Sequence, residues 1–172
     1  SQVNKGASNL DDLDLNPLLV QADPGENPRY CKDRHINKVP DTLDEKIWSD
    51  IKKTVDPNKK NNFDYEIENT SRSVGTRLSH HIYKTYGNNK LPDDTINIKL
   101  TGSAGQSLGA FLTKGIKLTI EGDCNDYVGK GLSGGTIVIS PSLKNKLISN
   151  ENTIIGNTVL YGATSGKLFA AG

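Results

Sequence analysis

The sequence predicts a mainly β protein whose C-terminal part, residues 92–172, is a β-helix with about 20 residues per coil. Apolar and polar residues alternate in the segments 95–102 and 115–122, as in strands that bury one face. The second segment repeats the first at a shift of 20 residues, and the same shift relates Gly109 to Gly129. Such a period is too short for a pair of helices or a propeller blade, and it fits one coil of short strands joined by tight bends.

Residues 1–40 are predicted to form an extended leader that links to the folded part. Prolines interrupt any helix in this segment: Pro17, Pro24, Pro28 and Pro40. The apolar run from Pro17 to Val20 predicts a patch that docks on a surface. That surface is either this chain's own folded part or another protein surface.

Residues 41–91 are predicted to hold two short helices and a strand that lead into the solenoid. The first helix spans residues 41–55, where Thr42 and Glu45 have the spacing of a capping box. Its apolar residues recur at four-residue spacing, on one face of a helix: Leu43, Ile47, Ile51 and Val55. Apolar and acidic residues then alternate over residues 63–69, which predicts a short strand.

The second helix is predicted to begin after Asn69 or Thr70, which are common cap residues, and to end at Gly87. Its apolar face consists of Val74, Leu78, Ile82 and Tyr86. His80 and His81 are adjacent on this helix and therefore point about 100° apart, which makes them a poor chelating pair. We predict that His81 edges the apolar face and that His80 is solvated.

In residues 92–172 glycines are predicted at the sharp bends of each coil, where a positive φ or a close backbone approach excludes a Cβ. The predicted structural turn glycines are Gly102, Gly105, Gly109, Gly115, Gly122, Gly129, Gly131, Gly134, Gly135, Gly156, Gly162 and Gly166. The interior is predicted to form where Ile96, Ile98 and Leu100 stack on Ile116, Leu118 and Ile120. A third copy is less regular, and residues 142–152 are predicted as a loop inserted between coils.

Composition argues against several classes of function. The net charge of +1 predicts no general nucleic-acid surface, and the absence of a long apolar run predicts no membrane span. Two cysteines, Cys31 and Cys124, cannot by themselves complete a three- or four-cysteine metal site. Cys31 and His35 have helical ligand spacing, but no second pair lies nearby. We therefore predict no metal ligand in this chain.

Two motifs in the repeat each have a structural and a chemical interpretation. The run from Gly129 to Gly134 matches G-x-G-x-x-G, which binds dinucleotides only where a helix follows. Residues 136–140 are instead typical of a strand, so we predict a solenoid bend. Asp123 and Asp126 suit a solenoid hydrolase with paired carboxylates, but turn-forming aspartates are the favoured interpretation. We predict no catalytic and no cofactor-binding residue in this chain.

Three segments resemble the glycine-rich C-terminal domain of glutamate synthase. They are LTGSAGQSLGAF (residues 100–111), EGDCNDYVGKGLSGG (residues 121–135) and IGNTVLYGATSG (residues 155–166). NTSRSVGTRL (residues 69–78) resembles the helix that leads into that domain. The resemblance is close over residues 63–172, and the leader resembles the linker from the preceding domain. The Asn- and Lys-rich character resembles fungal versions.

The resemblance implies a right-handed, single-stranded parallel β-helix within an oxidoreductase of ammonia assimilation. That enzyme moves the amide nitrogen of glutamine onto 2-oxoglutarate with electrons from NADH or NADPH, and so forms two glutamates. The implied partners are the other domains of the same polypeptide, an amidotransferase and an FMN-binding synthase domain with an iron–sulfur cluster. This segment is implied to support them without a cofactor or chemistry of its own. The expected location is the cytoplasm, with mitochondria as the alternative.

Other functions stay open at this point. A related glycine-rich solenoid is a subunit of formylmethanofuran dehydrogenase, and residues 125–135 are similar in both families. The helix within residues 71–87 favours glutamate synthase. A stand-alone interaction module is a third interpretation. The family continues with further coils beyond the position of Gly172, so exposed strand edges are expected to drive end-to-end self-association of the isolated segment. A sharp monomer in analytical ultracentrifugation at high concentration would contradict that expectation.

Overall fold

The computed structural model describes residues 16–19, 25–26, 30, 38, 40–87, 91–142 and 148–171. The chain divides into two units, residues 1–39 and residues 40–172. In the first unit the described residues include the 3-10 helix η1 (Asn16–Leu18), in which Leu18 is exposed. Most of the predicted extended leader lies outside the described residues.

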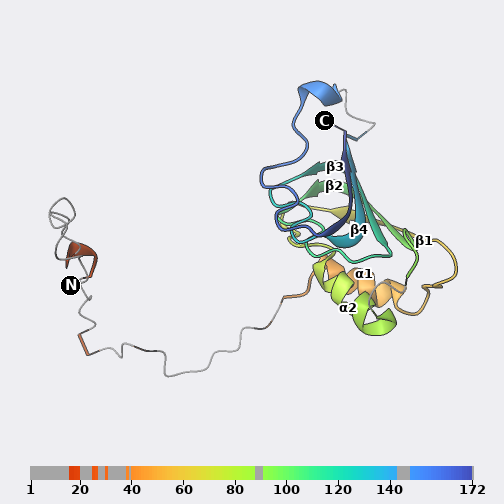
Figure 1. Ribbon diagram of the computed structural model, residues 1–172, viewed down its shortest axis with the longest axis horizontal. Coiled ribbons are helices and arrows are strands. Elements are labelled where there is room, and N and C mark those ends of the chain that lie inside the picture. The colour runs from red at the N-terminus through yellow and green to blue at the C-terminus, as the bar shows by residue number, and fades with distance from the viewer. Residues whose placement is uncertain are drawn as a thin grey trace. The chain divides into compact units, whose positions relative to one another are not determined.

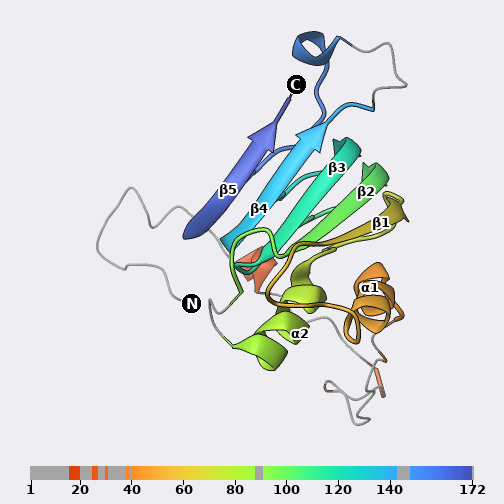
Figure 2. The same ribbon diagram turned by 90° about the vertical axis from the view of Figure 1, so that its right-hand side faces the viewer.

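Residues 40–172 form a parallel five-stranded sheet in which every strand pairs with the next strand along the chain (Figure 1, Figure 2). The strands are β1 (Asn61–Ile67), β2 (Ile96–Ala104), β3 (Ile116–Cys124), β4 (Ser133–Ser140) and β5 (Ser165–Ala170). The mainly β, parallel architecture confirms the predicted class at this level. The helices α1 (Leu43–Ile51) and α2 (Thr76–Tyr86) lie side by side on one side of the sheet in both views.

The core is a ladder of branched aliphatic side chains that runs across the sheet. Ile96 pairs with Ile116, and the same register places Ile98 opposite Leu118 and Leu100 opposite Ile120. All six side chains are fully buried, which confirms the predicted stacking. The helices add Ile47, Ile51, Leu78 and Ile82 to the same apolar cluster. The sheet and both helices therefore share one hydrophobic core.

The 20-residue register does not extend unchanged through the sheet. Lys117 of β3 pairs with Thr136 of β4, a shift of 19 residues. The difference arises in the first residues of β4: Thr113 still bridges to Ser133 at a shift of 20 residues, and the shift is 19 by the Lys117–Thr136 pair. The 20-residue shift between β2 and β3 is therefore not kept between β3 and β4. From β4 to β5 the shift grows, because the predicted insertion, which contains the 3-10 helix η2 (Ser149–Glu151), lies between them.

A second stack of backbone runs beside the sheet. We call it the turn stack, and it consists of residues 106–112, 126–132 and 157–163. In each segment alternate residues have φ between +55° and +67°. They are Ser107, Gly109 and Phe111, then Tyr127, Gly129 and Gly131, then Thr158, Leu160 and Gly162. Backbone N–H groups in one segment donate to carbonyls of the preceding one, as from Gly129 to Leu108 at 2.9 Å and from Leu160 to Val128 at 2.9 Å.

The second helix begins later than the sequence suggested. It starts at Thr76, not after Asn69 or Thr70. Ser73 and Gly75 have φ of +53° and +101°, which is incompatible with an α-helix. Ser73 donates its N–H to Gln106 at 2.8 Å, so contact with the turn stack fixes this non-helical backbone. The predicted end at Gly87 is confirmed, with φ of +81°.

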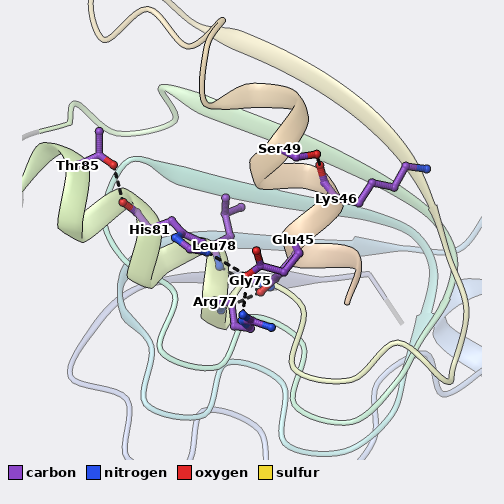
Figure 3. A network of polar contacts seen from close by, with 9 residues as sticks. Glu45, Lys46, Ser49, Gly75, Arg77, Leu78, His81 and Thr85 are labelled. Atoms are coloured by element: carbon purple, nitrogen blue, oxygen red, sulfur yellow. Dashed lines mark hydrogen bonds and ion pairs between the residues drawn. The ribbon is translucent and has the colours of Figure 1, made fainter. Parts of the chain in front are cut away.

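The predicted capping box does not form at the start of α1. Thr42 is the N-cap residue, but its side chain makes no cap hydrogen bond. Glu45 instead faces α2, where its Oε1 lies 2.9 Å from Arg77 Nη2 and 3.0 Å from His81 Nε2 (Figure 3). Partners more than thirty residues away in the sequence have replaced the local one. The strand β1 begins and ends two residues earlier than its predicted range of 63–69. The helix α1 begins two residues later and ends four residues earlier than its predicted range of 41–55.

A buried carboxylate on α1 caps the first turn of α2. Asp44 Oδ1 accepts the N–H of Gly75 at 2.7 Å, and Oδ2 accepts the N–H groups of Arg77 at 2.8 Å and Leu78 at 3.2 Å. These donors have no partner within the helix, and a carboxylate also interacts favourably with the helix N-terminus. Burial raises the pKa of Asp44 above its usual value, while the three backbone donors oppose the rise. Asp44 therefore joins the two helices through the backbone of α2.

We expect Asp44→Asn to lower the free energy of unfolding by about 3 kcal/mol, because the amide leaves a buried N–H without its carboxylate acceptor. Urea denaturation of the chain measures this change. Asp41→Asn is the matched control, since Asp41 is an exposed carboxylate three residues away, and it should change stability by less than about 0.5 kcal/mol. Equal unfolding midpoints for the two variants would contradict the capping role.

One corner of the sheet has no room for side chains. Ile67, Gly102 and Gly122 stand opposite one another in β1, β2 and β3. A Cβ at Gly102 would overlap the carbonyl oxygen of Ile67, and a Cβ at Gly122 would overlap that of Gly102. The overlapped atoms belong to the backbone, which cannot move aside as a flexible side chain can.

We expect Gly122→Ala to destabilise the chain by about 3 kcal/mol or more, since the methyl group must displace a neighbouring strand. Gly162→Ala is the control: Gly162 also has a positive φ, of +67°, but a Cβ added there would have no other atom within 4 Å. It should cost only the backbone strain, about 1 kcal/mol. Thermal unfolding of both variants measures these losses of stability. Similar losses would mean that the positive φ, and not the overlap with a neighbouring strand, determines the cost of the substitution.

Candidate functional site

The predicted turn glycines fall into two groups. Most have a positive φ: Gly102, Gly109, Gly115, Gly122, Gly129, Gly131, Gly134, Gly162 and Gly166. Gly105, Gly135 and Gly156 lack a positive φ but pack closely, so that a Cβ would press on Ser71, Leu112 or Asp126, respectively. Five of them, Gly102, Gly122, Gly134, Gly135 and Gly166, lie within strands, so the prediction that they are turn glycines is wrong at these positions. None of the twelve offers a side-chain functional group.

The G-x-G-x-x-G motif lies in the turn stack. The strand β4 begins at Ser133, inside the motif, so no helix follows its glycines. Gly129 and Gly131 donate their N–H groups to Leu108 and Tyr161, both at distances below 3 Å. The motif therefore lacks the helix N-terminus that binds a pyrophosphate in dinucleotide sites, and two of its backbone donors are already used.

The two aspartates of the repeat have different environments. Asp126 Oδ1 accepts the N–H of Asn157 at 2.7 Å, and Oδ2 lies 3.4 Å from Gln106 Nε2. Asp126 thus connects three successive segments of the turn stack. Asp123 is exposed, and both residues border one open hollow of about 410 Å³. One member of the pair is used to hold turns together, as the turn-forming interpretation requires.

The histidines lie where the sequence predicted. His80 is exposed, whereas His81 is half-buried and stacks on Trp48, with ring centroids 5.0 Å apart and planes 2° apart. The hydrogen bond from His81 is the largest cause that holds the pKa of Glu45 below its usual value, and Arg77 adds to it. This network joins α1 to α2 (Figure 3). Among the described residues no group of three or more His, Cys, Asp or Glu side chains could hold a metal ion.

The cysteines do not suit an iron–sulfur cluster. Cys124 is buried, and its burial, with Asp123 nearby, raises the pKa of its thiol to about 12. Cys31 lies outside the described residues. The chain has two cysteines in all, whereas such a cluster takes four thiolate ligands. The donor set of this chain therefore does not fit the cluster that the resemblance implies for the whole enzyme.

A groove without acidic side chains, lysine or arginine lies between α2 and the turn stack. Its volume is about 440 Å³, and it is lined by Thr76, Ser79, His80, Tyr83, Phe111, Thr113 and Ser133. Phe111 and Tyr83 are 56% and 51% exposed, which is high for large apolar side chains. Sequence reasoning missed this groove. The available signal was Phe111 itself, an aromatic residue at the position that Gly131 occupies in the following repeat.

No helix among the described residues is long and apolar enough to cross a bilayer.

Comparison with known proteins gives a consistent result. A family model described as the GXGXG motif matches residues 44–172, and so begins at α1, earlier than residue 63, where the close resemblance was expected to start. The large chain of NADPH glutamate synthase from Azospirillum brasilense is 57% identical over 99% of this chain and 11% of its own length. The NADH glutamate synthase of Saccharomyces cerevisiae is 45% identical over 99% of this chain and 8% of its own length.

A third relative takes its electrons from another donor. Ferredoxin-dependent glutamate synthase 2 from Synechocystis is 41% identical over 96% of this chain and 11% of its own length. The chain thus spans about a tenth of the length of these relatives and corresponds to one segment of them. Identity to the bacterial NADPH enzyme exceeds identity to the yeast enzyme. The chain belongs to the GXGXG-motif family, in a form found within glutamate synthases.

Proposed function

We propose that this chain is a structural domain of a glutamate synthase and has no chemistry of its own. In this role it supports the amidotransferase and FMN synthase domains of an enzyme that converts glutamine and 2-oxoglutarate into two glutamates. The observation that carries the proposal is the use of the chain's polar groups. Asp44, Glu45 and Asp126, which are suitable for acid–base chemistry, are engaged in joining helices and turns.

We also propose that the parallel sheet is one face of a right-handed β-helix. The turn stack supports this, because it follows the same order as the strands. A further contact lies at the C-terminal ends of β2 and β3, where Cys124 bridges to Ile155 and Asn125 donates its N–H to Ala104 at 3.0 Å. Parallel strands joined in sequence are connected by right-handed crossovers in nearly all proteins. Each turn of such a helix would contribute one strand and one bend.

The cofactors of the proposed enzyme belong elsewhere in the polypeptide. FMN, the iron–sulfur cluster and the NAD(P)H site are assigned to the other domains. The named relatives use NADPH, NADH or ferredoxin, and each is similar over nearly the whole of this chain. The electron donor is therefore recognised outside this segment. We propose the cytoplasm as its location, with mitochondria as the alternative.

The alternatives from the sequence are weaker on these observations. A solenoid subunit of another redox complex, or a stand-alone interaction module, would share the fold but not the similarity over 99% of the chain to glutamate synthases. A hydrolase would need Asp126 free to exchange protons, whereas its Oδ1 accepts a 2.7 Å hydrogen bond that holds a turn. Self-association of the isolated segment through the edge strand β5 stays a prediction.

The native context of the segment tests the proposed function. An antibody against residues 40–172 should capture from the source cells a polypeptide far larger than 18.7 kDa. That material should contain flavin and iron, and should form glutamate from glutamine and 2-oxoglutarate when supplied with its electron donor. Captured material near 18.7 kDa, without either cofactor, would overturn the assignment.

A further inference from the structure

We propose that the groove bordered by Phe111 is the surface on which another domain of the same polypeptide docks, through an apolar or aromatic side chain. The inference rests on the proposed function, and it specifies which face of the domain does the supporting. Phe111 belongs to the turn stack and Tyr83 to α2, so the groove joins the two parts that flank the sheet.

Phe111 has an unusual backbone conformation and an unusually high exposure for a large apolar residue. Its φ is +56°, in the left-handed region that a bulky side chain rarely adopts. Its aromatic ring is also 56% exposed, so burial within this chain does little to offset the strained backbone. The corresponding positions in the next two segments of the turn stack are Gly131 and Gly162, with φ of +63° and +67°. Glycine at position 111 would suit the fold better, and such local conflicts concentrate at functional sites.

The surroundings leave the Phe111 ring available to a partner. Gly131 lies against it, and a Cβ there would come within 2.5 Å of the ring carbon Cε1. The ring therefore packs on the Gly131 backbone on that side, and the exposed part of Phe111 borders the groove. Tyr83 borders the same groove with half its surface exposed. Aromatic side chains in a desolvated pocket contribute more to binding than other residues at most interfaces.

The chemistry of the lining indicates the chemistry of the occupant. No lysine, arginine, aspartate or glutamate lines the groove. By contrast, the hollow at the C-terminal ends of β2 and β3 is bordered by Glu121 and Asp123. An apolar side chain thus fits the Phe111 groove without leaving a buried charge. Because the chain spans only 11% of a relative such as the Azospirillum large chain, the occupant is assigned to the much longer remainder of the polypeptide.

Hydroxyl-radical footprinting of the full-length polypeptide tests whether the groove is covered. In the folded segment Tyr83 and Phe111 are half-exposed, so in an uncovered groove they should be oxidised within about twofold of their rates in the same protein unfolded in urea. Docking should reduce both rates by about tenfold or more, because a central aromatic anchor is fully desolvated. Rates within twofold of the unfolded protein would overturn the proposal.

Phe111→Gly separates docking from folding. It removes the anchor and also relieves the left-handed strain, so the unfolding midpoint should stay or rise while Tyr83 becomes oxidisable. Tyr127→Gly is the matched control: Tyr127 is another exposed aromatic residue of the turn stack, with φ of +64°, and it lies outside the groove. It should leave Tyr83 protected. A lower midpoint for Phe111→Gly, or unchanged protection of Tyr83, would mean that Phe111 serves only the fold.

The glutamate-forming activity of the same preparation separates the two proposals. An active enzyme in which Tyr83 is freely oxidised would overturn the docking surface and leave the proposed function intact. A polypeptide that protects Tyr83 but forms no glutamate from glutamine would overturn the function and leave the docking surface standing.

Discussion

The strands of this domain depend on one another for burial. Ile98, for example, is fully buried and lies between Leu118 of the next strand and Phe63 of the previous one. In such a stack stability is shared between neighbours rather than held in any one repeat. The close approach of successive backbones at Gly102 and Gly122 follows from the same requirement, because the strands must lie in register for their aliphatic side chains to meet.

The two helices, like the strands, depend on contacts with neighbouring segments. The segment from Ser73 to Gly75 already belongs to the stacked backbone, since Val74 accepts the N–H of Gly109 at 2.7 Å. The helix α2 therefore starts directly from the stack, and its first N–H groups need an acceptor. Asp44 supplies that acceptor from α1, and the contact between Glu45 and Arg77 lies beside it. These polar contacts thus join the two helices to each other, while their apolar faces share a hydrophobic core with the sheet.

Features that follow from a local sequence period were predicted correctly, whereas features that depend on contacts between distant residues were missed. The alternation of Ile96, Ile98 and Leu100 was enough to predict the strand, its buried face and its partner. The capping box failed because Glu45 has stronger partners on another helix. The start of α2 was misplaced because Ser73 is held by Gln106, thirty-three residues further along. The groove was missed because Tyr83 and Phe111 become neighbours only once the turn stack has formed.

The stacking of Trp48 on His81 gives the chain an internal optical label. Trp48 is the only tryptophan in the sequence, and its ring lies parallel to the imidazole at the contact between α1 and α2. The emission of the isolated chain therefore comes from the helix pair, whereas circular dichroism in the β region reports on the sheet. The two signals separate loss of the helices from dissolution of the strands. In a stack built from mutually dependent repeats, that separation shows whether unfolding starts at the helical end.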